Sequence, residues 1–295
     1  MGRLHFLIFG FLLYLLGFLL AIFSEHKFDL TKFFLGYIPF SFAHLSVSFS
    51  NDYYDQQSDK TSSRTMFSGG SRVLVEHPHL QITALKIAFM LLVLSAISLI
   101  LFTISFSYSY WLVLFGITGG LLGWFYTAPP LKLSYRGFGE IATMIAIGLL
   151  MPGMGYFVAA GTISSPFILF MIPLSAYGLF FIISVELPDL ESDTLSRKRN
   201  LVVMIGRKKA KLTLIIASTI GTLSLLITDQ LGLMPFNLIP TIILSTLPLI
   251  SAIICYILES EDRRITVKQV FSNMTSLIIL IIGMNINLLI HYLIA

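Results

Sequence analysis

Charged residues are scarce in this sequence. Only 12% of its 295 residues are charged, whereas 56% are hydrophobic, and the mean hydropathy is +0.87. Soluble domains carry about 25% charged residues, so the composition excludes an ordinary water-soluble protein. It predicts an all-α, polytopic membrane protein. The formal net charge of +4 then indicates orientation in the membrane rather than affinity for nucleic acid, and no nucleic-acid partner is expected.

Cysteine is almost absent. The single Cys255 lies in an apolar run and cannot form a disulfide within the chain, so we expect it to pack as a small apolar group. Low-complexity segments, linkers and a separate soluble domain are also missing. We therefore expect a single transmembrane domain over residues 1–295.

Apolar runs long enough to cross a bilayer are, by contrast, abundant. A spanning helix needs about 20 mostly apolar residues. The sequence predicts nine such helices, over residues 4–23, 33–51, 82–105, 109–127, 140–160, 166–187, 211–229, 235–257 and 270–294. The first run is too long for the apolar core of a typical signal peptide, and no small-residue cleavage site follows it, so we expect it to be retained.

Basic residues are distributed very unevenly between these helices. If the N-terminus is cytoplasmic, every Lys and Arg except Lys27 and Lys32 falls on the cytoplasmic side. The positive-inside rule therefore predicts a cytoplasmic N-terminus and an external C-terminus. The long polar loops also fall on the cytoplasmic side, and long loops are usually functional. We expect a multi-pass integral membrane protein, in the cell membrane of a prokaryote, with its active site facing the cytoplasm.

The first of two acidic clusters follows the second predicted helix. It consists of Asn51, Asp52, Asp55 and Asp59. The three aspartates are spaced i, i+3, i+7, which places them on one face of a helix. Like charges at this spacing repel each other unless a cation or basic groups neutralise them. The alternative is a solvated helix end on which acidic residues happen to fall.

The second cluster, Asp189 and Asp193, follows the sixth predicted helix, and Glu186 lies one turn before it. Pro188 should interrupt the helix there because proline lacks a backbone donor. Carboxylates beside a bilayer are costly and usually mark a function. Mg²⁺ prefers such oxygen ligands and completes its shell with water and substrate phosphates. Together the two clusters predict a clamp for a lipid diphosphate, with both clusters and Asn51 as metal ligands.

Basic and aromatic side chains accompany both clusters. The candidates for substrate binding are Asn51, Arg64, Arg72, Tyr126, Arg136 and Lys198, and Lys132 is a candidate catalytic residue. Arginine binds phosphate oxygens in pairs and lysine acts as a point charge, so we expect Arg72, Lys132 and Lys198 to contact the diphosphate. The alternative for the basic residues is anchoring at the membrane surface. Tyr126 could line the pocket or lie in the interfacial aromatic belt.

These residues and their order resemble the UbiA superfamily of intramembrane prenyltransferases. The family pattern N-D-x-x-D-x-x-x-D is matched from Asn51 to Asp59, and D-x-x-x-D from Asp189 to Asp193. The Tyr-Thr-x-Pro-Pro stretch that begins at Tyr126, with a basic residue after it, resembles a third motif. This chain departs from the family where it carries Val185-Glu186 and Pro188. Its Ser68-Gly69-Gly70-Ser71-Arg72 segment looks closer to the menaquinone-type branch, which prenylates dihydroxynaphthoate.

The resemblance implies a Mg²⁺-dependent enzyme that transfers a polyprenyl group from its diphosphate to an aromatic acceptor of the quinone-precursor type, such as 1,4-dihydroxy-2-naphthoate. The five aspartates and Lys132 would be catalytic, and membrane lipids would surround the protein. The alternatives of the same fold are an ether-lipid O-prenyltransferase acting on geranylgeranylglyceryl phosphate and a terpene cyclase. A cation-coupled transporter fits less well, because transport sites lie near the bilayer midplane, whereas these acids lie at helix ends.

Overall fold

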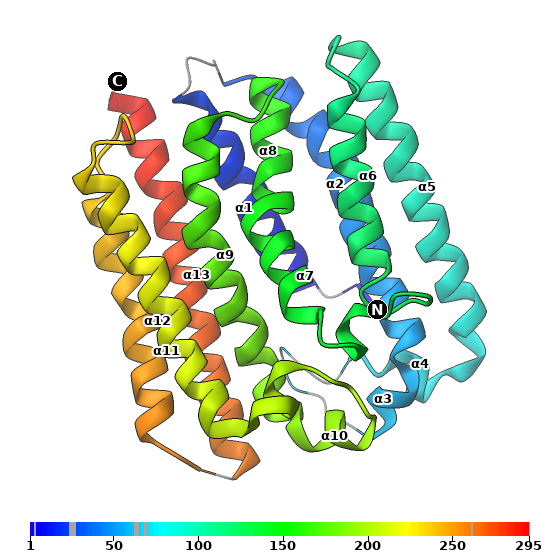
Figure 1. Cartoon of the computed structure of the whole chain (residues 1–295). Helices are drawn as coiled ribbons and strands as arrows, with labels where there is room; N and C mark the ends of the chain where they lie inside the picture. The colour runs from blue at the N-terminus through cyan, green and yellow to red at the C-terminus, as the bar shows by residue number, and fades with distance from the viewer. Residues whose placement is uncertain are drawn as a thin grey trace.

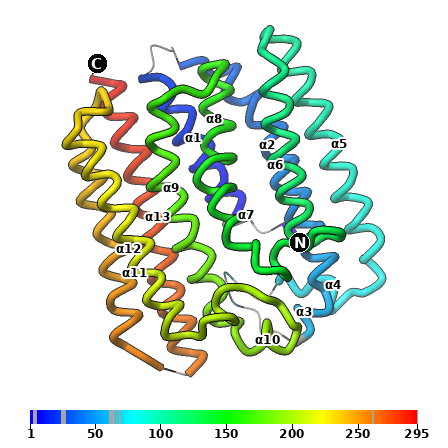
Figure 2. Tube along the Cα trace, viewed as in Figure 1, coloured from blue at the N-terminus to red at the C-terminus, as the bar shows by residue number. Residues whose placement is uncertain are grey.

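The computed structural model describes residues 1–2, 4–23, 28–61, 65, 67, 70–260 and 262–294. Every regular element in these residues is helical, which confirms the all-α prediction. The long helices run side by side, up and down, in one bundle (Figure 1). The same path is visible as a trace in Figure 2.

Seven helical segments of the described chain are long and apolar enough to cross a membrane. They are Leu30–Tyr54, Pro78–Ser105, Gly139–Ala160, Ser165–Leu195, Leu201–Gln230, Ile239–Ile257 and Arg263–Ile294. Each coincides with one of the predicted spans. The first and fourth predicted spans correspond to α1 (Leu4–Ile22) and α6 (Trp111–Trp124), which are apolar but shorter. Nine spans therefore remain a prediction.

Most long helices pack against helices close to them in the chain, whereas α1 packs against the more distant α8 (Met151–Ala160) and α13 (Arg263–Ile294). Helix α2 (Leu30–Tyr54) packs on α5 (Gln81–Ser105), and α9 (Ser165–Glu186), α11 (Leu201–Gln230), α12 (Ile239–Ile257) and α13 follow one another on the other side. Two glycines set the contact of α1 with α8. A Cβ on Gly17 would lie 1.7 Å from the Pro152 carbonyl oxygen, and one on Gly155 would lie 1.9 Å from that of Tyr14. Only glycine allows the two backbones to approach so closely.

One span is irregular at its centre. It consists of α7 (Gly139–Ile145), a π-helical turn η3 (Ala146–Leu150) and α8. π-turns of this kind occur mostly as single turns and often at functional sites. Here Ala146, Ile147 and Leu150 of the turn line the internal cavity described below. The π-helical turn therefore directs these side chains to the cavity inside the bundle.

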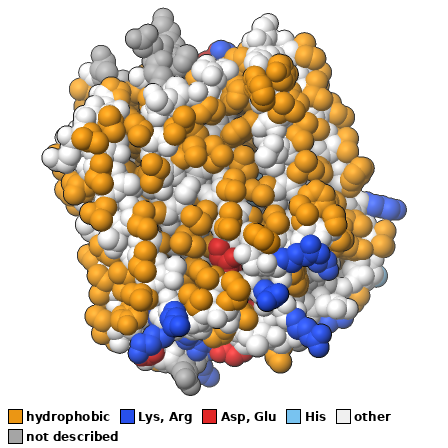
Figure 3. Space-filling model, in the orientation of Figure 1, with side chains coloured by type: hydrophobic (Ala, Val, Ile, Leu, Met, Phe, Trp, Pro, Cys, Tyr) orange, Lys and Arg blue, Asp and Glu red, His pale blue; other side chains and the backbone are white. Residues whose placement is uncertain are grey.

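Short elements gather at one end of the bundle, which we call the polar end. They are α3 (Gln56–Thr61), α4 (Val73–Glu76) with turn η1 (Pro78–Leu80), turn η2 (Leu133–Tyr135), turn η4 (Leu187–Asp189) and α10 (Leu190–Leu195). The C-terminus lies at the opposite end (Figure 1). In Figure 3 hydrophobic side chains cover most of the face above, whereas Lys and Arg gather towards the polar end. Both acidic clusters lie at this end, as expected.

Candidate functional site

Lys198 joins the two acidic clusters in space. Its Nζ lies 3.5 Å from Oδ1 of Asp193 and 4.0 Å from Oδ2 of Asp55. The chain reaches this position because Arg197, after α10, adopts a left-handed conformation (φ 56°) and Lys198 then donates its N–H to the Asp193 carbonyl. One cation therefore neutralises a carboxylate from each cluster.

The first cluster keeps most of its predicted helical geometry. Helix α2 ends at Tyr54 with Asp55 as its C-cap, yet the N–H of Asp55 donates to the Asn51 carbonyl and that of Asp59 to the Asp55 carbonyl. Asp52 and Asp59 are buried, with 3% and 7% of their surfaces exposed. The backbone hydrogen bonds thus remain helical across the break between α2 and α3.

The segment after the first cluster folds back onto it. The Ser71 hydroxyl and N–H both donate to the Asp52 carboxylate. Gly70 has a φ of 65°, and a Cβ there would lie 1.8 Å from Oδ2 of Asp59. Gly70 is therefore required by both its conformation and its contact with the carboxylate.

Tyr135 is a site residue that the motifs did not predict. Its hydroxyl donates to Oδ1 of Asp55 over 2.6 Å, and Lys198 Nζ lies 5.1 Å from the centre of its ring. Burial, and then the Asp55 charge, raise the pKa of Tyr135, so it remains a donor. Burial alone would lower the pKa of Lys198, but Asp55 and Asp193 outweigh it and raise that pKa. Lys198 is therefore a cation at neutral pH.

The second cluster follows the interruption that Pro188 was expected to cause. Helix α9 ends at Glu186, turn η4 carries Asp189, and α10 carries Asp193. The Asn200 side chain donates to Oδ2 of Asp193 over 2.7 Å and also caps α11 by accepting the N–H of Val203. The position of an asparagine directly before a helix is the signal that could have identified it.

Arg263 is a further cation near the second cluster, and the sequence analysis did not identify it. Its NH2 lies 3.9 Å from Oδ1 of Asp189, and its Nε–H donates to the Pro188 carbonyl. Arg263 opens α13, far from either motif in sequence. No local pattern in the sequence distinguishes it from its basic neighbours.

A cavity of about 380 Å³ connects the two clusters to the interior of the bundle. Asp55, Asp59, Asp189, Asp193 and Lys198 line its polar part, whereas Asp52 is not among the described lining residues. The apolar part is lined by aromatic and aliphatic side chains of α1, α2, α5, α6, η3 and α9, among them Phe9, Phe40, Leu99, Phe115, Leu150 and Phe181. The cavity can thus hold an anionic head beside the acidic clusters and an apolar chain beyond them.

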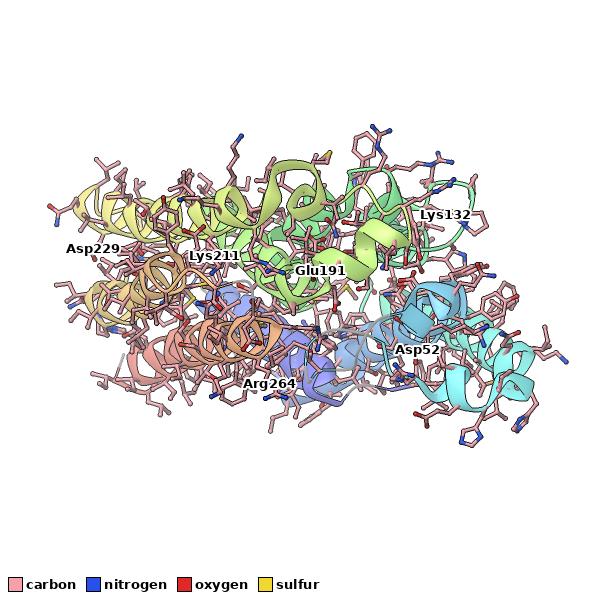
Figure 4. All side chains as sticks on the ribbon, turned by 90° about the horizontal axis from the view of Figure 1, so that it is seen from below. Asp52, Lys132, Glu191, Lys211, Asp229 and Arg264 are labelled. Carbon is pink, nitrogen blue, oxygen red and sulfur yellow. The ribbon has the colours of Figure 1, made fainter. Side chains whose placement is uncertain are left out.

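Only some of the other predicted side chains line this cavity. Tyr126 lines it, and Asn51 accepts a 2.8 Å hydrogen bond from Thr127. Lys132 is exposed, 5.6 Å from the Tyr135 ring centre, on a loop at the edge of the bundle (Figure 4). Arg136 is exposed as well. Neither Lys132 nor Arg136 is among the described residues that line the cavity.

Two further predicted residues belong to the segment after the first cluster. Arg72 is half-buried, adopts a left-handed conformation (φ 61°) and follows Ser71, which binds Asp52. It therefore lies close to the first cluster. The prediction for Arg64 lies outside the described residues.

The donor atoms of the site fit Mg²⁺. Within the described ranges, no three Asp, Glu, His or Cys side chains converge as a ready-made metal cage. Mg²⁺ does not require one, because one or two carboxylates together with substrate phosphates and water complete its shell. The aspartates of both clusters offer such pairs of oxygen donors beside a cavity, and Asn51 adds a carbonyl oxygen.

Residues 10–277 match the UbiA prenyltransferase family. The chain is 30% identical over 217 residues to a 1,4-dihydroxy-2-naphthoate octaprenyltransferase of Bacillus subtilis (strain 168), covering 73% of this chain and 68% of that protein. It is 25% identical over 164 residues to a protein of the same name from Mycobacterium leprae (strain TN), covering 55% and 53% respectively.

Solved structures show a similar fold. The apo structure of a UbiA homologue from Aeropyrum pernix K1 has a TM-score of 0.71 at 14% identity and covers 93% of this chain and 96% of that one. A UbiA homologue from Archaeoglobus fulgidus, bound to GPP and Mg²⁺, has a TM-score of 0.64 at 16% identity, covering 93% and 95%. At these identities the similarity establishes the fold alone.

Replacing Lys198 should destabilise the polar end. In Lys198→Met the carboxylates of Asp55 and Asp193 lose their shared cation, and breaking a buried ion pair costs about 3 kcal/mol of unfolding free energy. Lys208→Met is the matched control, because its pair with Glu259 is exposed on both sides and should contribute at most about 1 kcal/mol. Denaturant unfolding in detergent measures both variants. Equal stability of the two variants would show that Lys198 does not hold the clusters together.

Proposed function

This chain belongs to the UbiA prenyltransferase family, and we propose that it transfers a polyprenyl group from polyprenyl diphosphate to an aromatic quinone precursor. The proposed acceptor is 1,4-dihydroxy-2-naphthoate, in line with the names of the two bacterial relatives. The observation that carries the proposal is the single cavity that joins both aspartate clusters to an apolar chamber. An amphiphile with a diphosphate head and a hydrocarbon tail matches this division.

The diphosphate head would be held by the polar part of the cavity. Asp52, Asp55 and Asp59 on one side and Asp189 and Asp193 on the other are the proposed metal ligands, with Asn51 as an additional oxygen donor. Bound Mg²⁺ would neutralise the phosphate oxygens and favour departure of the diphosphate. The donor chemistry and the Mg²⁺ and GPP in the Archaeoglobus homologue support this assignment.

Lys198 is the basic residue best placed to act on the leaving group. It lines the cavity between the clusters and is a cation at neutral pH. A fixed positive charge stabilises the negative charge that develops on the departing diphosphate. Arg72 lies near the first cluster and would assist, whereas Lys132 and Arg136, at the rim, would meet the diphosphate on entry. Arg64 retains its predicted role.

The apolar part of the cavity would hold the prenyl tail and protect the reaction. Departure of the diphosphate with its bonding electrons leaves an allylic cation, which the electron-rich ring of the acceptor attacks. The ring regains its aromaticity when the attacked carbon loses the group it carried, a proton or, where that carbon bears the carboxylate, CO₂. Walls such as Phe9, Phe40 and Phe181 exclude water that would otherwise quench the cation. A terpene cyclase or an ether-lipid O-prenyltransferase would need the same two-part cavity, and the relatives' names favour an aromatic acceptor over both. A transporter is disfavoured, because the ionised groups lie at one end of the cavity.

We also propose the arrangement in the membrane. Residues 1–295 form one transmembrane prenyltransferase domain with nine spans, α1 and α6 being the two short ones. The N-terminus and the polar end face the cytoplasm, since nearly all Lys and Arg residues lie at that end. In a prokaryote this places the site at the cytoplasmic side of the cell membrane.

The function is tested with detergent-solubilised protein, Mg²⁺ and geranylgeranyl diphosphate. Dihydroxynaphthoate, hydroxybenzoate and geranylgeranylglyceryl phosphate are offered separately, and mass spectrometry follows prenylated product and released diphosphate. We expect product with dihydroxynaphthoate. Asp52→Ala and Asp189→Ala should each lower kcat at least about 100-fold, because each removes a ligand of the charge-stabilising metal. Product with the glyceryl phosphate alone would identify the ether-lipid branch instead.

Controls separate loss of the site from loss of the fold. Glu76→Ala removes an exposed carboxylate at the same end of the bundle and should keep full activity. The two aspartate variants should retain the wild-type elution profile and remain folded at the assay temperature. Wild-type turnover that persists in excess EDTA would rule out the magnesium mechanism.

Gly119 should set the length of the prenyl group. It lines the cavity from α6, and a Cβ there would come no closer than 4.0 Å to its nearest neighbour, Leu150. Gly119→Phe would fill part of the chamber, so the variant should use geranyl diphosphate and lose geranylgeranyl and longer donors. Product yield against donor length measures this. Ile117→Phe, exposed on the same helix, is the control, and a uniform loss with all donors would contradict the assignment.

The orientation is tested by labelling engineered cysteines in intact cells. Cys255 is buried, and Cys255→Ser provides a background without cysteine. In this background Leu231→Cys, exposed at the far end of α11, should react with a membrane-impermeant maleimide. Glu76→Cys, exposed at the polar end, should react only after permeabilisation. The reverse pattern would place the site outside the cell.

A further inference from the structure

Glu186 is a buried acid that the diphosphate clamp does not use. It is the last residue of α9, lies one turn before Asp189 and has 8% of its surface exposed. Its side chain lines the cavity, and no donor among the described residues hydrogen bonds its Oε2. Leaving a buried polar atom without a partner is costly, because the atom has given up its hydrogen bonds to water. A ligand that brings a donor would remove this cost.

Glu140 is a second buried acid that interacts with Glu186. It has 5% of its surface exposed, opens α7, and accepts the N–H of Leu201, the first residue of α11. Two helix N-termini therefore stabilise its negative charge. The Glu186 carboxyl group is within hydrogen-bonding reach of that of Glu140. A hydrogen bond between two carboxyl groups requires that they share one proton, so the pair carries a single negative charge. This contact uses one Glu186 oxygen and leaves Oε2 without a partner among the described residues.

The protein groups around Glu186 do not supply the missing donor. Tyr126 lines the same part of the cavity, but its hydroxyl interacts with Thr143. Lys198 is already engaged by Asp55 and Asp193. Glu186 thus stands where the polar part of the cavity meets the apolar part, next to the position at which an acceptor must approach the diphosphate end of the prenyl group.

We infer that Glu186 binds the acceptor substrate directly, its Oε2 accepting a hydrogen bond from a ring hydroxyl, and so orients the ring for attack. This inference rests on the proposed function. It specifies the chemistry of the acceptor at this point, since two adjacent carboxyl groups favour a neutral donor and repel a carboxylate or phosphate. A carboxylate on the acceptor would therefore point away from Glu186 and the hydroxyl toward it.

The test combines variants of Glu186 with acceptors that lack a hydroxyl donor. Full-length protein in detergent is assayed with dihydroxynaphthoate and with each of its two monomethyl ethers, at saturating prenyl diphosphate. Loss of a hydrogen bond to a carboxyl pair that carries one negative charge should raise the acceptor KM of Glu186→Leu by about 10- to 100-fold, with the prenyl diphosphate KM unchanged. One of the two methyl ethers should impose a loss of similar size on the wild type and almost none on Glu186→Leu, because the same interaction cannot be lost twice.

Matched variants exclude indirect explanations. Glu186→Gln keeps a carbonyl acceptor and should recover most of the acceptor affinity. Glu259→Leu removes an exposed carboxylate and should behave as wild type. Should Glu186→Leu fail to fold, Glu186→Asp takes its place, since it withdraws the oxygen from the hydroxyl while keeping a carboxyl group.

The outcomes distinguish this inference from the proposed function. If the wild type is active but the effects of methylation and of the Glu186 substitution multiply independently, Glu186 does not contact the hydroxyl and the inference is wrong. A rise in the prenyl diphosphate KM equal to that of the acceptor assigns Glu186 to the clamp and likewise overturns it. A wild type that prenylates no hydroxyl-bearing ring refutes the proposed function itself.

Discussion

The constraint on which the site depends is the cost of holding several carboxylates together beside an apolar chamber. Charges at such a position repel each other and are poorly solvated, so each must meet a donor or a cation. Lys198 bridges Asp55 and Asp193, Ser71 covers Asp52, and Tyr135 donates to Asp55. The short helices and loops of the polar end position these donors and this cation next to the carboxylates.

The spanning helices could be predicted from the sequence because a bilayer leaves few alternatives. About 20 apolar residues must be helical to cross it, and seven such predictions match described helices. Helix α6 ends at Trp124, earlier than the predicted residue 127. The chain leaves the helix before the Pro129-Pro130 pair and turns back, with the N–H of Leu133 bonded to the Phe125 carbonyl. Such turns depend on local backbone bonding that an apolar run does not reveal.

The gathering of the aspartates at one end of the bundle could also be predicted, whereas the basic and aromatic side chains that join them could be predicted only in part. Aspartates at helix ends identify themselves by residue type and spacing. Lys132 and Lys198 both follow polar motifs and looked equivalent in sequence, yet only Lys198 reaches the cavity, while Lys132 is exposed. The left-handed turn at Arg197 directs Lys198 inward. Tyr135 and Glu140 become part of the site only through contacts between loops far apart in sequence, and no local pattern encodes those contacts.

The charge balance of the site bears on the order in which ligands bind. The described lining of the polar part offers several carboxyl groups, including Glu186, against Lys198 as its basic side chain. An excess of negative charge attracts a divalent cation and repels a bare diphosphate. The diphosphate should therefore bind with its metal ions or after them. Lys198 can then exchange its contacts with Asp55 and Asp193 for a phosphate oxygen, because the metal ions replace it as the counter-charge. In the proposed reaction, the cation that joins the two clusters would thus become available to the leaving group.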